Sequence, residues 1–153
     1  MAGLKDRLRG YLTAAMKARD EVRTRTLRMA LTSVANEEVA GHAARDLDDA
    51  EVLRLLAIQA KRRREAADAF EAAGRTDQAS AERAEEDILR AYLPVQLSDT
   101  ELAAIVAEVI AETGATGPRS MGQVMKAISP RVAGRAEGGR VAEQVRRALA
   151  NSG

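Results

Sequence analysis

The sequence predicts an all-α fold, and three observations support this class. Ala, Leu, Val, Arg and Glu dominate the 153 residues, and Ala and the unbranched side chains lose little conformational entropy in a helix. Apolar residues recur at helical spacing in several segments, whereas no segment shows the alternation of a β-strand. Tyr11, Phe70 and Tyr92 are the only aromatic residues, so the core must consist of Leu, Val, Ile, Met and Ala.

The first two predicted helices cover about residues 3–18 and 20–40. One apolar stripe runs along the first helix and is formed by Leu4, Leu8, Leu12, Ala15 and Met16. The second helix shows the i, i+3, i+4, i+7 spacing of an amphipathic helix. Its apolar residues are Leu27, Ala30, Leu31, Val34 and Ala35. Gly41 and His42 are expected to end it.

The third and fourth helices are predicted to form an antiparallel hairpin. Asp48 is a suitable N-cap for the third helix, and Glu51 lies in its first turn, where the helix dipole favours acids. Its buried face is expected to extend to Gly74 through Leu53, Leu56, Ala57, Ala60, Ala67 and Phe70. A turn at residues 74–77 leads into the fourth helix, which is expected to reach about Leu93.

Charged residues along these helices are predicted to lie on solvated faces. Four consecutive bases, Lys61–Arg64, are spread around the helix at about 100° per residue and cannot all face one nucleic-acid duplex. Acidic pairs and runs are expected on polar faces or at helix N-termini, namely Glu37-Glu38, Asp48-Asp49 and Glu85-Glu86-Asp87. No two of these acids are expected to share an apolar pocket, so none is assigned a catalytic or metal-binding role.

Pro94 marks the start of a different part of the chain, because proline pushes the preceding residue away from helical geometry. Ser98 and Glu101 then form a predicted capping box for a fifth helix, which Gly114 is expected to end. The sixth helix is expected to bury Met121, Val124, Met125 and Ile128 and to break at Ser129-Pro130. The seventh helix is expected to begin near Gly139.

These elements predict two subdomains. Residues 1–93 form an elongated N-terminal helical hairpin or bundle, residues 94–97 a hinge, and residues 98–150 a compact three-helix tail.

The composition excludes several classes of site. There is no cysteine, which removes disulfides, thiolate metal sites and cysteine nucleophiles, and the single histidine, His42, cannot form a multi-histidine metal site. Residues 1–20 are charged throughout, unlike a signal peptide, and no apolar run approaches the roughly 20 residues of a membrane span. We therefore expect a cytoplasmic protein with no catalytic residues, metal or cofactor of its own.

The distribution of charge points to the C-terminal segment. The net charge of the chain is +1, yet residues 116–153 contain seven bases and two acids. A glycine-rich stretch in that segment, Gly134–Gly139, precedes a helix, and a helix N-terminus with exposed amides is a setting for phosphate binding. The stretch lacks the lysine and hydroxyl of a nucleotide P-loop and follows no strand. Glycines that serve only in turns explain the same pattern, and both interpretations stay open here.

A protein–protein adaptor is an alternative interpretation of the tail. Met121, Val124 and Met125 are suited to a groove for a partner helix, because methionine adapts to irregular surfaces. The same three side chains fill the core of the tail if they are buried, so their burial distinguishes the two interpretations.

Motifs spread over about residues 3–150 resemble the YqeY-like family. Those in the N-terminal part are Arg28-Met29, Asn36-Glu37-Glu38 and Phe70–Arg75. Those in the C-terminal part are Leu93–Ser98, Met121-Gly122, Val124-Met125-Lys126 and Gly134-Arg135-Ala136. The family is related to the C-terminal helical and tail region of the B subunit of the glutamine-dependent tRNA amidotransferase, where that region contacts tRNA.

The resemblance implies a non-catalytic tRNA-binding or amidotransferase-associated module. Carbon–nitrogen ligase activity with glutamine as amide donor is linked to the family by association, since this chain corresponds only to an appendage of that enzyme. The expected RNA contacts are Lys126, Arg131, Arg135 and Arg140 on phosphates, with Gly134, Gly138 and Gly139 allowing close backbone approach. The tail has no aromatic residue for base stacking, so recognition is expected to depend on shape, phosphates and salt.

Overall fold

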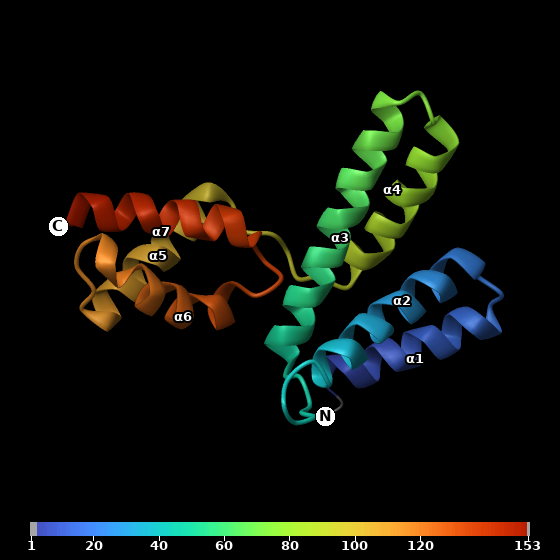
Figure 1. The fold of residues 1–153 in the computed structure, drawn as a ribbon, viewed down its shortest axis with the longest axis horizontal. Coiled ribbons are helices and arrows are strands. Elements are labelled where there is room, and N and C mark those ends of the chain that lie inside the picture. Colours follow the sequence, from blue (N-terminus) through green and yellow to red (C-terminus); the bar gives the residue numbers. More distant parts are fainter. Residues whose placement is uncertain (1–2, 153) are drawn as a thin grey trace. The chain divides into compact units, whose positions relative to one another are not determined.

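The computed structural model describes residues 3–152, and its regular secondary structure within that range is entirely helical (Figure 1). The prediction of an all-α fold is confirmed. The residues group into two compact units that divide between Leu93 and Pro94. Among the described residues, no helix is both long enough and apolar enough to cross a membrane.

The first unit contains two pairs of helices. α1 (Leu4–Lys17) packs along α2 (Glu21–Glu38), and α3 (Asp49–Ala72) packs along α4 (Thr76–Ala91) (Figure 1). α2 also contacts α3 and α4, so the two pairs share one hydrophobic core. Among the most deeply buried side chains of this core are Leu8, Leu27, Val34, Val52, Leu56 and Leu89.

Side-chain caps fix the starts of α2 and α3. The Asp48 carboxylate accepts a hydrogen bond from the backbone N–H of Glu51, whose own carboxylate accepts from the N–H of Asp48. This capping box satisfies two amides that have no partner within the helix, and it confirms Asp48 as the predicted N-cap. Asp20 caps α2 by accepting from the N–H of Arg23.

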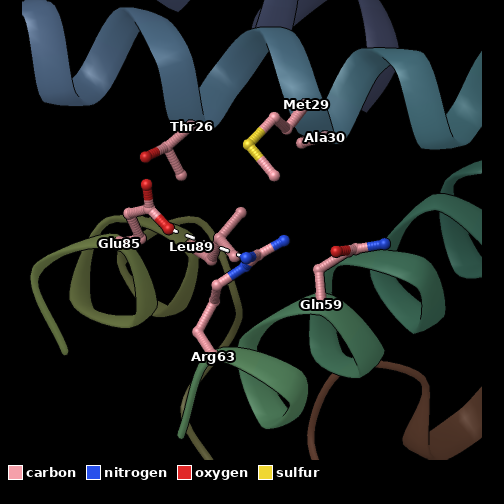
Figure 2. Close-up of a pocket in the computed structure, with 7 residues that line it drawn as sticks. All are labelled: Thr26, Met29, Ala30, Gln59, Arg63, Glu85 and Leu89. Atoms are coloured by element: carbon pink, nitrogen blue, oxygen red, sulfur yellow. Dashed lines mark ion pairs between the residues drawn. The ribbon is translucent and has the colours of Figure 1, made fainter. Parts of the chain in front are cut away.

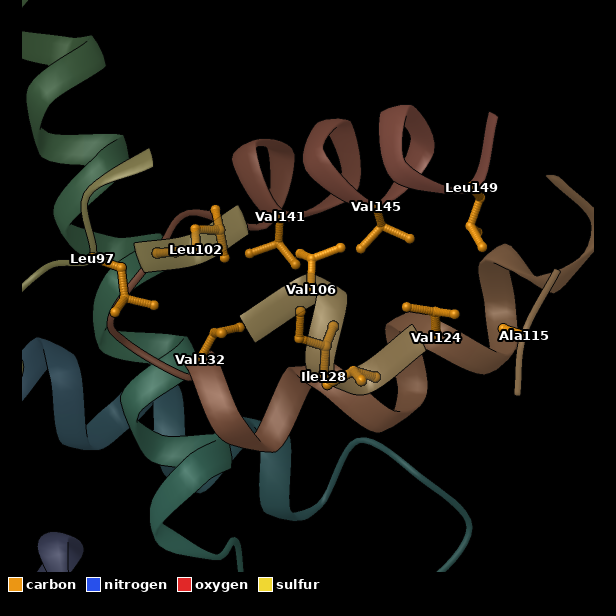
Figure 3. Packing of buried hydrophobic residues seen from close by; sticks show 12 residues of the cluster. Leu97, Leu102, Val106, Ala115, Val124, Ile128, Val132, Val141, Val145 and Leu149 are labelled. Atoms are coloured by element: carbon orange, nitrogen blue, oxygen red, sulfur yellow. The ribbon is translucent and has the colours of Figure 1, made fainter. Parts of the chain in front are cut away.

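Residues 94–152 of the second unit form three α-helices and one short 3₁₀ turn. These are α5 (Asp99–Thr113), η1 (Pro118–Ser120), α6 (Met121–Val132) and α7 (Gly138–Ser152). The inward-facing aliphatic side chains of the three α-helices meet in one core (Figure 3). Its fully buried members are Leu102, Val106, Val109, Val124, Ile128, Val145 and Leu149.

The predicted start and end of α5 are confirmed. Ser98 caps the helix through the N–H of Glu101, and the Glu101 carboxylate accepts in return from the N–H of Ser98. Gly114 ends the helix with a φ of 68°, in the left-handed region that glycine adopts without strain.

The predicted end of α6 at Ser129-Pro130 is wrong, because the helix continues to Val132. Pro130 has no N–H, so the hydrogen bond to the carbonyl of Lys126 is missing. Ser129 nevertheless stays helical, and its hydroxyl donates to the carbonyl of Met125 at 2.7 Å. Val132 is buried in the core of the unit, and this burial favours continuation of the last turn beyond the proline.

Candidate nucleic-acid interface

The loop between α6 and α7 is held by the segment that precedes α5. The backbone N–H of Leu97 donates to the carbonyl of Arg135 at 2.7 Å, and the side-chain amide of Gln96 donates to the carbonyl of Gly134 at 2.7 Å. Gly134 has a φ of 72°, a conformation that an L side chain adopts only with strain. The turn therefore requires glycine at this position. The two hydrogen bonds hold the backbone of the loop in place at Gly134 and Arg135.

Arg140 links the first turn of α7 to the start of α5. Its Nη2 donates to the backbone carbonyl of Leu97 at 3.0 Å and to the carboxylate of Asp99 at 2.8 Å. The Arg140 side chain is still 36% exposed. This predicted phosphate contact is thus also an internal contact of the second unit.

Arg131 lies near the end of α6 and faces the acidic helix α5. Its guanidinium is 2.5 Å from the carboxylate of Glu108 and 3.7 Å from that of Glu112. The hydrogen bond with Glu108 raises the pKa of Arg131 above its ordinary value. Both carboxylates are well exposed, so the ion pairs lie at the surface of the unit.

The predicted residues do not all form one cluster. Asp99 and Glu108 are separated on α5 by about two and a half turns, so their side chains leave the helix on opposite sides. Arg140 accordingly pairs on one side of α5 and Arg131 on the other. The loop and the first turn of α7 bring together Gly134, Arg135, Gly138, Gly139 and Arg140, whereas Lys126 and Arg131 lie on α6.

Lys126 and Arg135 form no ion pair with any of residues 3–152. Lys126 is exposed on α6, and Arg135 is half-buried in the loop. Hydrogen bonds from the backbone and side chain of Ser98 lower the pKa of Glu101, and the nearby charge of Arg135 adds a smaller effect in the same direction. Lys126 and Arg135 are therefore the two bases of the predicted site whose charges are not neutralised by an ion pair.

Gly138 and Gly139 are the first two residues of α7, and both are exposed. A Cβ at either position would meet no other atom within 4 Å, and neither residue has a positive φ. Neither turn geometry nor packing requires glycine there, so the interpretation of these two as turn residues has no support. The two glycines place no side chain beside the first turn of α7, and a helix N-terminus is a setting for an anion.

The positive excess predicted for the tail is smaller in the folded unit. The second unit contains seven bases and six acids, because acidic α5 belongs to it. Four bases form ion pairs within the unit, namely Arg131, Arg140, Arg146 and Arg147. The partners of Arg131 and Arg140 lie more than twenty residues away in the sequence. The count of charges over residues 116–153 therefore left out these acids, which precede that segment in the sequence. The acidic residues of α5 were visible in the sequence and could have indicated such pairing.

The apolar residues of α6 fill the core instead of lining an open groove. Val124 is fully buried beside Ile128 (Figure 3), and Met121 and Met125 pack against the same cluster. This packing gives no support to an adaptor groove built from Met121, Val124 and Met125.

A small pocket in the first unit lies between α2, α3 and α4 (Figure 2). Its volume of about 10 Å³ is the space of about one water molecule. Glu85 borders the pocket, and its carboxylate pairs with Arg25 at 3.1 Å and with Arg63 at 3.8 Å. The prediction that Glu85 lies on a polar face is wrong. Its side chain is buried, and the two arginines compensate its charge.

The basic run Lys61–Arg64 does not present one surface. Arg63 turns toward α4 and pairs with Glu82 and Glu85, whereas Lys61 pairs with Glu65 on its own helix. This agrees with the prediction that the run is not a simple nucleic-acid patch. Within residues 3–152, no three or more His, Cys, Asp or Glu side chains are grouped so as to hold a metal ion.

Comparison with known protein families gives a match over most of the chain. The family model described as "Yqey-like protein" matches residues 5–149, which is nearly the whole chain. No curated protein matches the sequence.

Proposed function

Because the chain belongs to the YqeY-like family, we propose that it is a non-catalytic module that binds tRNA through its second unit. The observation that supports this most directly is the exposed first turn of α7. Gly138 and Gly139 place no side chain beside it although packing does not require glycine there, and Arg135 and Arg140 lie on either side of them in the sequence. A helix N-terminus beside basic side chains suits a backbone phosphate.

The residues of the proposed site have different parts in binding. Lys126 and Arg135 contact phosphates directly, since neither is engaged in an ion pair within the described chain. Arg131 and Arg140 contact phosphates after their carboxylate partners have been displaced. Gly134 shapes the loop that presents Arg135.

The chemistry of this surface suits shape and charge recognition. Residues 94–153 include no aromatic side chain, so bases cannot stack on Phe, Tyr or Trp of this unit. Binding through phosphates alone releases counterions and weakens steeply as salt rises. Any chemical step on the RNA, such as the amide transfer associated with related enzymes, belongs to another chain in this proposal.

An electrophoretic shift of bulk tRNA at low and moderate salt tests the proposal. Wild type is expected to shift tRNA at low salt, and Lys126→Ala combined with Arg135→Ala is expected to weaken the shift. Arg146→Ala combined with Arg147→Ala is the matched control. It removes the same charge from the later turns of α7, where both arginines pair with Glu143. Failure of the wild type to bind at low salt, or equal loss in both double variants, contradicts the proposal.

Association with an amidotransferase is the alternative to direct RNA binding. A pull-down from cell extract with and without ribonuclease separates the two. Under our proposal, ribonuclease releases the captured translation proteins because RNA bridges them to the module. Capture that resists ribonuclease indicates direct protein contact instead.

A further inference from the structure

We propose that the acidic helix α5 competes with RNA for the same arginines. Its carboxylates pair with Arg131 and Arg140 until an RNA phosphate displaces them. This inference rests on the proposed function and adds a form of regulation to the same site. If α5 competes in this way, the affinity for RNA depends on acidic residues of α5 that form no favourable contact with RNA themselves.

The geometry at Arg131 is that of an occupied anion site. The guanidinium lies 2.5 Å from Glu108 and 3.7 Å from Glu112, so two carboxylates on successive turns of α5 face one base. The side chains of these acids are 58% and 69% exposed. Carboxylates this exposed can rotate into solvent without leaving a buried charge behind.

Arg140 shows the same arrangement on the other side of α5. Its partner Asp99 is 81% exposed, and the guanidinium also donates to the carbonyl of Leu97. A guanidinium has five N–H donors, so Arg140 retains its backbone anchor when the carboxylate is exchanged for a phosphate. The base is thus positioned at the start of α7 before any ligand arrives.

The energetics favour exchange. Exposed ion pairs are weak because water screens them, and the planar fork of arginine binds carboxylate and phosphate in similar geometry. A single small anion gains little by replacing a carboxylate. A polyanion that also binds Lys126, Arg135 and the amides of α7 gains several contacts at once. The carboxylates of α5 therefore discriminate against weakly bound anionic ligands.

Neutral isosteres of the acids test the competition. We expect Asp99→Asn and Glu108→Gln each to tighten binding of bulk tRNA by about two- to five-fold, the range that corresponds to the strength of one exposed pair. Fluorescence anisotropy of labelled tRNA on the full chain measures the change. Glu108 lies in the middle of α5 on an exposed face, so Glu108→Gln is not expected to affect folding. It therefore provides the test even if Asp99→Asn weakens the start of α5.

Arginine-null backgrounds separate competition from general electrostatics. In the Arg131→Gln background, Glu108→Gln is expected to give no gain in tRNA affinity. In the Arg140→Gln background, Asp99→Asn is expected to give none either. Glu143→Gln is the matched control, because it frees Arg146 and Arg147 outside the site. If the gain in affinity persists without the arginine, or if Glu143→Gln gives an equal gain, the proposed competition is wrong while the proposed RNA binding still holds. Absence of binding by the wild type and every variant overturns both proposals.

Discussion

The backbone geometry of the second unit requires some of its glycines and not others. Gly134 and Gly114 have positive φ and shape a loop and a helix end, whereas Gly138 and Gly139 have neither a positive φ nor a close neighbour. A fifth glycine, Gly122 near the start of α6, also has open space where a Cβ would stand. The residue type is the same in each case, and only the conformation and surroundings reveal whether the backbone requires glycine.

A pair of glycine substitutions tests this distinction. Gly114→Ala is expected to destabilise the chain by about 1 kcal/mol, because alanine is strained at a φ of 68° although its Cβ has room. Gly122→Ala is expected to stabilise it by about 0.5 kcal/mol, because alanine loses less entropy in a helix. Urea unfolding followed by circular dichroism measures both. Equal effects of the two substitutions contradict the assignment.

Glu85 is a buried charge of the first unit. Its carboxylate is enclosed between Arg25 and Arg63, so Glu85→Ala removes the partner of Arg25 and leaves Arg63 with Glu82 alone. We expect a loss of about 1.5–3 kcal/mol in the free energy of unfolding, the usual contribution of a hydrogen bond to a charged group. Asp87→Ala, an exposed acid on the same helix, is expected to change stability by less than about 0.5 kcal/mol. Similar losses for the two variants exclude a special role for Glu85.

Helix starts were predicted from the sequence more accurately than the end of α6. The N-cap at Asp48 and the capping box at Ser98 were predicted from the local sequence because a cap is a local interaction, whereas the reciprocal bond from Asp48 to Glu51 was not predicted. The end of α6 was not, because burial of Val132 in the core overrides the local effect of Pro130. Residues 94–97 were predicted to be a hinge, and Leu97 of this segment packs in the core of the second unit.

The capping boxes also predict how stability depends on pH. Backbone hydrogen bonds from Ser98 and Asp48 lower the pKa of Glu101 and Glu51 from the ordinary value of 4.5. A lowered pKa in the folded state adds stability above pH 4.5, and this stability is lost as the pH falls through the folded value. Glu101→Gln retains the box but does not titrate, so its urea midpoint is expected to fall less than that of wild type between pH 6 and pH 3. An unchanged pH dependence contradicts this contribution.

At the scale of the whole molecule, the fold class was predictable and the charge surface was not. Helical periodicity is a property of each segment, so the sequence predicted each helix within a few residues. Neutralisation of Arg131 and Arg140 by α5 joins segments far apart in the chain and depends on tertiary packing. The same packing leaves Lys126 and Arg135 without an ion pair among residues 3–152, so these two bases lead the seven residues that we propose as RNA contacts.

The salt dependence of tRNA affinity tests the central claim most directly. Log affinity of the full chain for bulk tRNA is measured against log salt for wild type, for Lys126→Ala with Arg135→Ala, and for Arg146→Ala with Arg147→Ala. The account predicts a steep negative slope for wild type, reduced by about two in the first double variant, because each lost phosphate contact lowers the slope by about one. The control is expected to retain the wild-type slope. A flat wild-type line, or the same reduction in both double variants, contradicts a phosphate-binding site at Lys126 and Arg135.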